Sequence, residues 1–215
     1  MAPEHWRRVR GPSTYTAHLV TRRPMLGCLF EIVETLVLTL LIFLVIQNFV
    51  AQPYKVQQQS MEHTLKPDQY VLVDKLTPRL DVYKRGDIVV FTPPADWAQE
   101  DGTPFIKRVI GVGEDEIEIR EGLVFVNGTQ LDEPYLFADD GEPPQPTTAA
   151  QEHWLVPAGE LFLMGDHRTN SADSRSFGPV PLANVIGRAW LRYWPVSVFG
   201  ILPTPTHPEL ETAGP

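Results

Sequence analysis

The longest apolar stretch of this 215-residue chain covers residues 25–50 and constrains its fold more than any other feature. Its centre, residues 36–46, carries a single polar side chain, that of Thr39. A helix needs about 20 mostly apolar residues to cross the hydrocarbon core of a bilayer. The stretch is long enough provided that Glu31 and Glu34, which lie one helical turn apart, stand near one interface. It therefore predicts one transmembrane helix.

The flanks of this stretch predict its orientation. Five arginines precede it, namely Arg7, Arg8, Arg10, Arg22 and Arg23. Because short positive flanks stay in the cytoplasm, we expect residues 1–24 to form a cytoplasmic tail and the chain after the stretch to lie outside. That makes a single-pass protein of the cytoplasmic membrane. The alternatives are a buried helix of a soluble protein and a cleaved signal peptide, but the exit "NFVAQP" has Ala51 with no small residue two places earlier.

The chain beyond residue 50 is acidic, with 13 Lys and Arg against 24 Asp and Glu. Nucleic-acid binding needs clustered cations, so we expect no nucleic-acid partner. The single cysteine, Cys28, falls in the apolar stretch, which excludes an internal disulfide and a paired-cysteine metal site. We predict neither a metal nor a cofactor.

Short, alternating apolar runs replace the long one after residue 50. Bounded by Gly, Pro, Asp or Asn, they are typical of strands, at residues 70–76, 87–91, 105–112, 116–120, 123–131, 153–157, 160–166 and 186–195. The Asn127-Gly128 dipeptide predicts a tight hairpin turn. No window of about 12 residues shows a helical period. We therefore expect a mainly β domain at residues 51–201, built on an antiparallel, barrel-like or sandwich-like sheet.

Two polar stretches match neither pattern. Residues 137–152, "FADDGEPPQPTTAAQE", are rich in proline and acids, and we expect a surface loop there. Residues 202–215, "LPTPTHPELETAGP", contain too few apolar side chains to pack, and we expect a disordered tail.

The stretch "QQQSMEHTL", residues 57–65, contains a candidate nucleophile, Ser60. A serine hydroxyl needs a base to attack an amide, and His63 is the nearest candidate along the chain. Lys107 is the other candidate, because it lies in the apolar strand "PFIKRVIG". Strand alternation puts Lys107 and Arg108 on opposite faces, so we expect only one of these adjacent cations in the core. Lysine can lose its proton when desolvated and arginine cannot, which favours Lys107 as a base over a lysine that reaches water from a strand edge.

The segment "GDHRTNSADSRSFGPV", residues 165–180, lies between two apolar strands. Its many Gly, Asp, Asn and Ser residues are compatible with ordinary turn chemistry. Ser171, Asp173 and Arg175 alternate, however, and could set a hydroxyl and an ion pair on one side of a loop. A rigid guanidinium fork would fix such a loop well.

Along the chain, the membrane segment is followed by "SMEHTL", "GDIVVF", "IKRVIGVGED" and "GDHRTNSADSRSFGPV", in that order. In this order and spacing the chain resembles the bacterial type I signal peptidases, from the membrane segment to about Trp194. The resemblance implies a membrane-anchored serine endopeptidase that removes signal peptides from secretory preproteins. It implies cleavage after a small residue, in an Ala-X-Ala pattern, by a Ser-Lys dyad and an acyl-enzyme. It also implies a small inserted β region, here residues 114–158.

The resemblance assigns the chemical roles as well. Ser60 matches the nucleophile and Lys107 the general base, so no histidine takes part. Ser171 matches a hydroxyl that orients the lysine. The Ser60 backbone N–H matches the oxyanion hole, and the Gln58 amide is a candidate second donor.

Further residues match supporting positions. Asp173, with Arg175 as its partner, matches the acid that holds the last segment in place, whereas Asp166 and Arg168 match structural positions. The residues that match shallow pockets for small substrate side chains are Val56, Met61, Leu65, Phe105 and Ile106. The partners implied are preproteins, membrane lipid and the secretion translocon.

Three positions depart from the family pattern. His63 stands where a proline is usual, His167 replaces an asparagine, and Gln58 stands where many members have serine or glycine. The alternatives are a Ser-His site, a self-cleaving repressor-type Ser-Lys peptidase, and a catalytically impaired or non-enzymatic membrane-anchored binding protein on the same fold. The membrane segment argues against the repressor type, and the presence of Ser60 with Lys107 argues against a non-enzyme.

Overall fold

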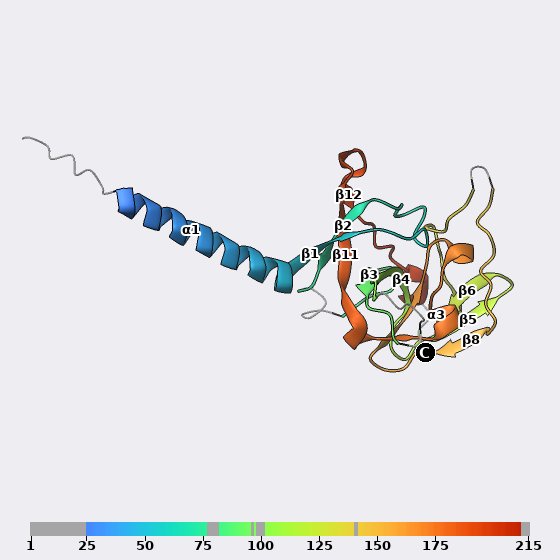
Figure 1. Ribbon diagram of the computed structural model, residues 1–215. Coiled ribbons are helices and arrows are strands. Elements are labelled where there is room, and N and C mark those ends of the chain that lie inside the picture. Colours follow the sequence, from blue (N-terminus) through green and yellow to red (C-terminus); the bar gives the residue numbers. More distant parts are fainter. Residues whose placement is uncertain (1–24, 77–81, 96, 98–101, 140–141, 212–215) are drawn as a thin grey trace, which may run out of the picture. The chain divides into compact units, whose positions relative to one another are not determined.

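The structure is a computed structural model that describes residues 25–76, 82–95, 97, 102–139 and 142–211 (Figure 1). It divides into two compact units, with the boundary between Ile42 and Phe43. The predicted cytoplasmic tail, residues 1–24, lies outside the described residues.

The predicted membrane segment is helical. Helix α1 (Met25–Val45) passes into a short π-helical stretch, η1 (Ile46–Val50). Polar side chains within it bond to the backbone one turn earlier, as where the Thr35 hydroxyl donates to the carbonyl of Glu31 at 2.7 Å. Such bonds satisfy a donor that would otherwise need water. The described residues contain one helix long and apolar enough to cross a membrane, Gly27–Val50, and its large apolar side chains are exposed.

The larger sheet is antiparallel and curls into a half-barrel (Figure 1). Its strand order is β1-β2-β11-β3-β4-β9-β10, and β12 pairs with β11. The strands are β1 (Ala51–Lys55), β2 (Tyr70–Asp74), β3 (Ile88–Phe91), β4 (Phe105–Gly111), β9 (Glu160–Met164), β10 (Val180–Pro181), β11 (Val185–Trp194) and β12 (Gly200–Ile201). The predicted mainly antiparallel β fold is confirmed.

A smaller antiparallel sheet, in the order β7-β6-β5-β8, falls within residues 114–158. Its strands are β5 (Glu116–Arg120), β6 (Leu123–Val126), β7 (Thr129–Gln130) and β8 (His153–Leu155). Asn127 and Gly128 have φ angles of 51° and 77°, as the tight turn between β6 and β7 requires, so the predicted hairpin is confirmed. The short helices are η2 (Arg168–Asn170), α3 (Ser174–Phe177), η3 (Leu182–Asn184), η4 (Val196–Val198) and α4 (Pro208–Glu211).

Strand β4 lies inside the larger sheet, between β3 and β9, and every one of its residues is buried. Ile106 joins an apolar cluster with residues of β2 and β3, and its neighbours Phe105 and Val109 join a second cluster with residues of β9 and β10. Because apolar side chains cover both faces, β4 offers no solvent-facing side to a charged residue.

Both adjacent cations of β4 are therefore buried, Lys107 at 1% and Arg108 at 0% exposed. The prediction that only one of them lies in the core is wrong. Arg108 Nε and Nη2 donate to the two carboxylate oxygens of Asp166 at 2.8 and 2.7 Å, and Nη1 donates to the Gly86 carbonyl at 2.8 Å. The guanidinium also lies 4.0 Å from the centre of the Tyr135 ring. These partners replace the water that a buried cation would otherwise need.

Residues 202–211 pack on the domain, which differs from the disordered tail that we expected. Leu202 is 6% and His207 8% exposed, and Leu210 of α4 packs against the apolar cluster of the smaller sheet. Few apolar anchors are needed here because the prolines between them limit the entropy of the unfolded segment. Residues 212–215 lie outside the described part of the chain.

The Arg108–Asp166 pair predicts a large effect on stability. Replacing Asp166 by Ala leaves a buried, unpaired guanidinium and should lower the free energy of unfolding by about 3–5 kcal/mol. The matched control is Glu116→Ala, which removes a half-exposed partner of His153 and should change it by about 0–1 kcal/mol. Urea unfolding of both variants measures the difference, and equal losses would contradict the assignment.

Candidate active site

Ser60 opens a tight turn between β1 and β2. The turn is closed by backbone bonds from Glu62 N to Gln59 O at 3.0 Å and from Leu65 N to Met61 O at 2.7 Å. The Met61 and Leu65 side chains are completely buried, so they fix the turn to the core. Ser60 itself is 4% exposed.

Lys107 reaches Ser60 from the middle of β4. Its Nζ donates a hydrogen bond of 2.6 Å to Ser60 Oγ, between residues 47 positions apart. The amine lies 5.2 Å from the centre of the Phe105 ring. The distance suits a nucleophile and its base, for which about 2.6–3.2 Å is expected.

Burial lowers the pKa of the Lys107 amine to about 8. Desolvation is the largest cause, because an ammonium loses its hydration inside the sheet. The Asp173 and Asp166 carboxylates act in the opposite direction, whereas the charge of Arg175 adds to the lowering. With a pKa of about 8, roughly a tenth of Lys107 is neutral at pH 7 and about half at pH 8, and this neutral form can accept a proton.

The Asp173–Arg175 pair holds the segment after β9. Arg175 Nε and Nη2 donate to the two Asp173 oxygens at 2.8 and 2.9 Å, and Asp173 also accepts from Gly165 N at 3.0 Å. Burial alone would raise the pKa of Asp173, but Arg175 lowers it, with smaller contributions from the Ser171 hydroxyl and the Gly165 N–H. The carboxylate thus stays charged, and it caps α3 through the Arg175 N–H.

Ser171 lies in the site without the bond that we expected. Its Oγ is buried and makes no hydrogen bond of standard geometry with any described residue, Lys107 included. A Cβ at Gly165 would lie only 2.3 Å from Ser171 Oγ and 2.5 Å from the Ser60 carbonyl oxygen. Gly165 therefore lets the last segment approach Ser60, a role that sequence reasoning missed because it arises only from this close contact.

Two other structural contacts support the site. The Thr64 hydroxyl donates to Asp166 at 2.6 Å and ties the Ser60 turn to the buried Arg108 pair. Arg168 forms a buried ion pair with Glu133 and donates to the Thr147 hydroxyl at 2.9 Å. Sequence analysis did not single out Thr64 or Glu133, since their partners are remote in sequence.

The described histidines lie apart from the Ser60 hydroxyl. His63 is exposed, makes no hydrogen bond to Ser60 in the described structure, and has a left-handed backbone with a φ of 84°. The ring of His167 contacts Glu62, with Nδ1 and Oε2 3.1 Å apart. Of the candidate bases, only Lys107 contacts the Ser60 hydroxyl.

Two adjoining cavities border the dyad. One of about 850 Å³ is lined by Ser60 and Ser171, and one of about 150 Å³ is lined by Val56. Gln58 and Phe105 border both cavities. The two cavities therefore adjoin each other beside Ser60.

The predicted pocket residues divide into two groups. Val56, Phe105 and Ile106 line the smaller cavity. Met61 and Leu65 line neither cavity and lie in the apolar cluster that also contains Val56 and Ile106. Their position is that of a supporting layer under the cleft.

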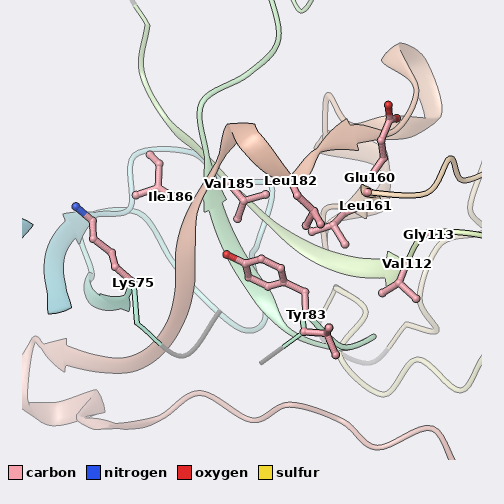
Figure 2. A pocket seen from close by; sticks show the side chains of 11 residues that line it. Lys75, Tyr83, Val112, Gly113, Glu160, Leu161, Leu182, Val185 and Ile186 are labelled. Carbon is pink, nitrogen blue, oxygen red and sulfur yellow. The ribbon is translucent and has the colours of Figure 1, made fainter. Parts of the chain in front are cut away.

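A further cavity of about 570 Å³ lies over another part of the larger sheet (Figure 2). Tyr83, Leu161 and Val185 gather around it, and the charged ends of Lys75 and Glu160 point away from them (Figure 2). No predicted site residue lines this cavity, so it is separate from the dyad.

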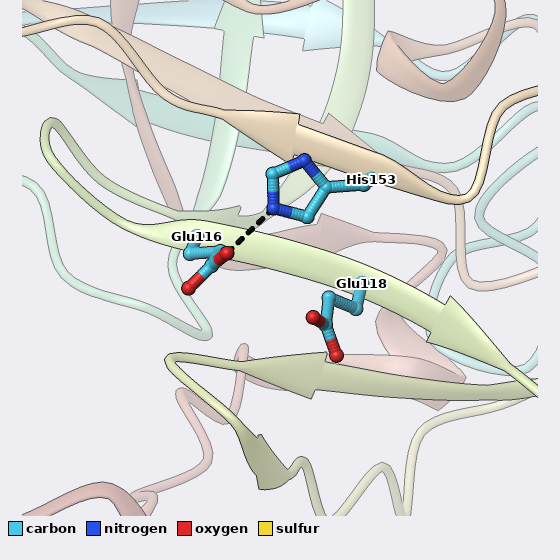
Figure 3. A group of neighbouring side chains, drawn as sticks. All are labelled: Glu116, Glu118 and His153. Carbon is cyan, nitrogen blue, oxygen red and sulfur yellow. Dashed lines mark hydrogen bonds and ion pairs between the residues drawn. The ribbon is translucent and has the colours of Figure 1, made fainter.

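One cluster of possible metal ligands occurs among the described residues. Glu116, Glu118 and His153 face one another on β5 and β8, with ligand atoms within 4.8 Å of one another (Figure 3). His153 Nε2 already contacts Glu116 at 2.6 Å, and Arg120 pairs with Glu118 at 3.0 Å. The members of the cluster already contact one another or Arg120, the cluster contains no residue of the dyad, and we assign no metal to it.

The chain is similar to several known proteins. The chain matches the family model described as signal peptidase, peptidase S26, over residues 29–194. A probable signal peptidase I-2 of Synechocystis sp. is 37% identical over 173 residues, which cover 80% of this chain and 76% of that protein. Signal peptidase I of Leptolyngbya laminosa is 36% identical over 180 residues, 82% of this chain and 85% of that protein. The solved structure of a signal peptidase I from Enterococcus faecalis is 32% identical and covers 50% of this chain and 97% of its own, with a TM-score of 0.39.

The matched region contains the serine, the buried lysine and the ion pair of the last segment. It spans well over half of the chain, and the two cyanobacterial relatives align along most of their own length. This chain belongs to the signal peptidase family, peptidase S26.

Proposed function

We propose that this signal peptide-cleaving serine peptidase uses Ser60 as its nucleophile and Lys107 as its general base. The observation that carries the proposal is the 2.6 Å bond between Lys107 Nζ and Ser60 Oγ, together with the pKa of about 8 of this buried amine. No other described titratable side chain bonds to the hydroxyl.

The proposed reaction moves one proton through Lys107. The neutral amine accepts the Ser60 proton while Oγ bonds to the substrate carbonyl carbon. The Ser60 backbone N–H stabilises the negative carbonyl oxygen, and the Gln58 amide is a candidate second donor. As the C–N bond breaks, Lys107 returns the proton to the leaving amine, and an acyl-enzyme remains. Lys107 then takes a proton from a water molecule whose oxygen attacks the ester carbonyl carbon. As the C–Oγ bond breaks, Lys107 gives this proton to Oγ, which restores the Ser60 hydroxyl and the neutral amine.

The residues around the dyad have supporting roles in this proposal. Asp173 and Arg175 hold the last segment in place, and Ser171, which lines the larger cavity together with Ser60, is proposed to orient the lysine. This role rests on position alone, because the structure contains no bond between Ser171 and Lys107.

The substrate is proposed to be the end of a preprotein's signal peptide, bound as an added strand. Side chains at alternate positions of a strand point the same way, so the residues one and three places before the cut would face the same wall. Val56, Phe105 and Ile106, which match the family's pockets for small side chains, border the smaller cavity. This supports cleavage in an Ala-X-Ala pattern.

The apolar N-terminal helix is proposed to anchor the enzyme in the cytoplasmic membrane, with residues 1–24 inside and the β domain outside. The five N-terminal arginines and the exposed apolar surface of Gly27–Val50 support this topology. Membrane lipid and the secretion translocon are the partners that it implies.

Substitution of the dyad tests the chemistry. Ser60→Ala and Lys107→Arg should each lower the kcat for preprotein cleavage by about a thousandfold or more, because arginine keeps its charge and cannot accept the proton. His63→Asn is the control, since asparagine tolerates the left-handed backbone at this position, and it should keep most of the activity. Activity in Lys107→Arg, with loss in the histidine variant, would reverse the assignment.

The pH dependence follows from the need for a neutral lysine. With the pKa of Lys107 at about 8, the base is protonated and inactive at lower pH. The kcat/KM should therefore rise about tenfold per unit up to that pKa and then level off. A rate profile with its midpoint near pH 8 is expected, whereas a midpoint of about 6.5 would indicate a histidine.

Substrate size tests the cleft. Replacing the alanine one place before the cut by leucine should lower kcat/KM by at least about tenfold, because the proposed pocket beside Val56, Phe105 and Ile106 accepts small side chains. The same exchange two places before the cut, where the side chain points away from the wall, is the control. Equal cleavage of the two preproteins would contradict the proposed binding mode.

A further inference from the structure

The backbone of Ser60 is held by the segment that follows β9. His167 N donates to the carbonyl oxygen of Ser60 itself at 3.0 Å. Gly165, two residues earlier, lies so close to that oxygen that it has no room for a Cβ. The peptide after the nucleophile is therefore fixed by the position of residues 165–167.

The side chain of His167 is in turn held on two sides. One ring nitrogen, Nδ1, lies 3.1 Å from Glu62 Oε2, two residues beyond Ser60. The ring face stacks on Phe137, with centroids 4.1 Å apart and an interplanar angle of 24°. Side-chain exposure is 17% for His167 and 22% for Glu62, so both are largely shielded. A flat ring with a polar edge is needed to make both contacts at once.

Phe137 connects the inserted region to His167 and to the segment around it. It begins the proline-rich stretch at residues 137–152, and its own N–H donates to the carbonyl of Asp166 at 3.0 Å. The same stretch is bound further on, where Arg175 Nη1 donates to the Thr148 carbonyl at 3.0 Å. The stretch is thus attached to the segment that contacts the nucleophile.

We propose that His167 is a positioning residue for Ser60. We propose further that Phe137, at the start of the proline-rich stretch, supports this role by holding the His167 ring. The inference rests on the proposed role of Ser60 as nucleophile. His167 does not touch the Ser60 hydroxyl, and it acts through the peptide whose rotation sets the direction of that hydroxyl. A displacement of a fraction of an ångström at the reacting atom is enough to slow the reaction severalfold.

Three variants of His167 separate its two contacts. Asn can keep a polar contact with Glu62 without the stack, Phe can keep the stack without the polar contact, and Ala keeps neither. We expect kcat for preprotein cleavage to fall by about tenfold in His167→Ala, with smaller losses in His167→Asn and His167→Phe. KM should stay within about twofold, and the pH midpoint should remain that of Lys107, because neither the cleft nor the environment of the amine is altered.

His153→Ala is the matched control. His153 also pairs with a glutamate, at 2.6 Å from Glu116, but it lies on the smaller sheet and contacts no part of the dyad (Figure 3). Its kcat should equal that of the wild type. An equal loss in both alanine variants would overturn the inference, and so would a kcat in His167→Ala within twofold of the wild type, or a change in KM alone.

A double-mutant cycle tests the link to the insert. Phe137→Leu keeps the backbone bond to Asp166 and removes the stack, so it should lower kcat severalfold in the wild type and have no further effect in His167→Ala. Additive losses would overturn the link.

Thermal unfolding of each variant checks folding. If His167→Ala does not fold, Glu62→Ala is the second variant, and an unchanged kcat in that variant would overturn the inference. Wild-type protein without preprotein cleavage would instead count against the proposed function itself.

Discussion

The pKa of the buried Lys107 amine depends on the carboxylates around it. Burial lowers the pKa of Lys107, while Asp166 and Asp173 nearby would restore it by favouring the ammonium. Each of these acids is bound by an arginine through two hydrogen bonds, Arg108 in one case and Arg175 in the other. The two ion pairs therefore do more than hold the chain together. By balancing the nearby negative charge, they keep the interior of the sheet suitable for a neutral lysine, as the proposed base requires.

The segment at residues 165–180, which contains Arg168 and Arg175, joins the larger sheet to the inserted region. Arg168 pairs with Glu133 and bonds to Thr147, and Arg175 bonds to the Thr148 carbonyl. Guanidinium groups suit this task because several fixed donors can bind carboxylates and carbonyls at once. The insert is thus attached by polar contacts that begin within a few residues of the catalytic cleft, and it forms part of the frame of the site.

Local sequence patterns correctly predicted strands and the hairpin turn, because neighbouring residues determine these features. Strand alternation located the sheets, and the Asn127-Gly128 dipeptide predicted its hairpin because the required positive φ angles belong to those two residues. Periodicity could place Lys107 on a strand face, but only the family resemblance named Ser60 as its partner. Strand alternation gave a wrong prediction for Arg108, which is buried together with Lys107. Its burial depends on Asp166, which lies 58 positions away. Long-range contacts of this kind leave no local pattern to read.

The backbone of His63 limits which residues this turn can accept. Its φ of 84° is left-handed, whereas a proline ring holds φ near about −65°. A proline at this position would therefore not fit the turn, even though the family resemblance makes proline the usual residue there. Because Ser60 opens the same turn, a change of backbone at residue 63 would reach the serine within three residues.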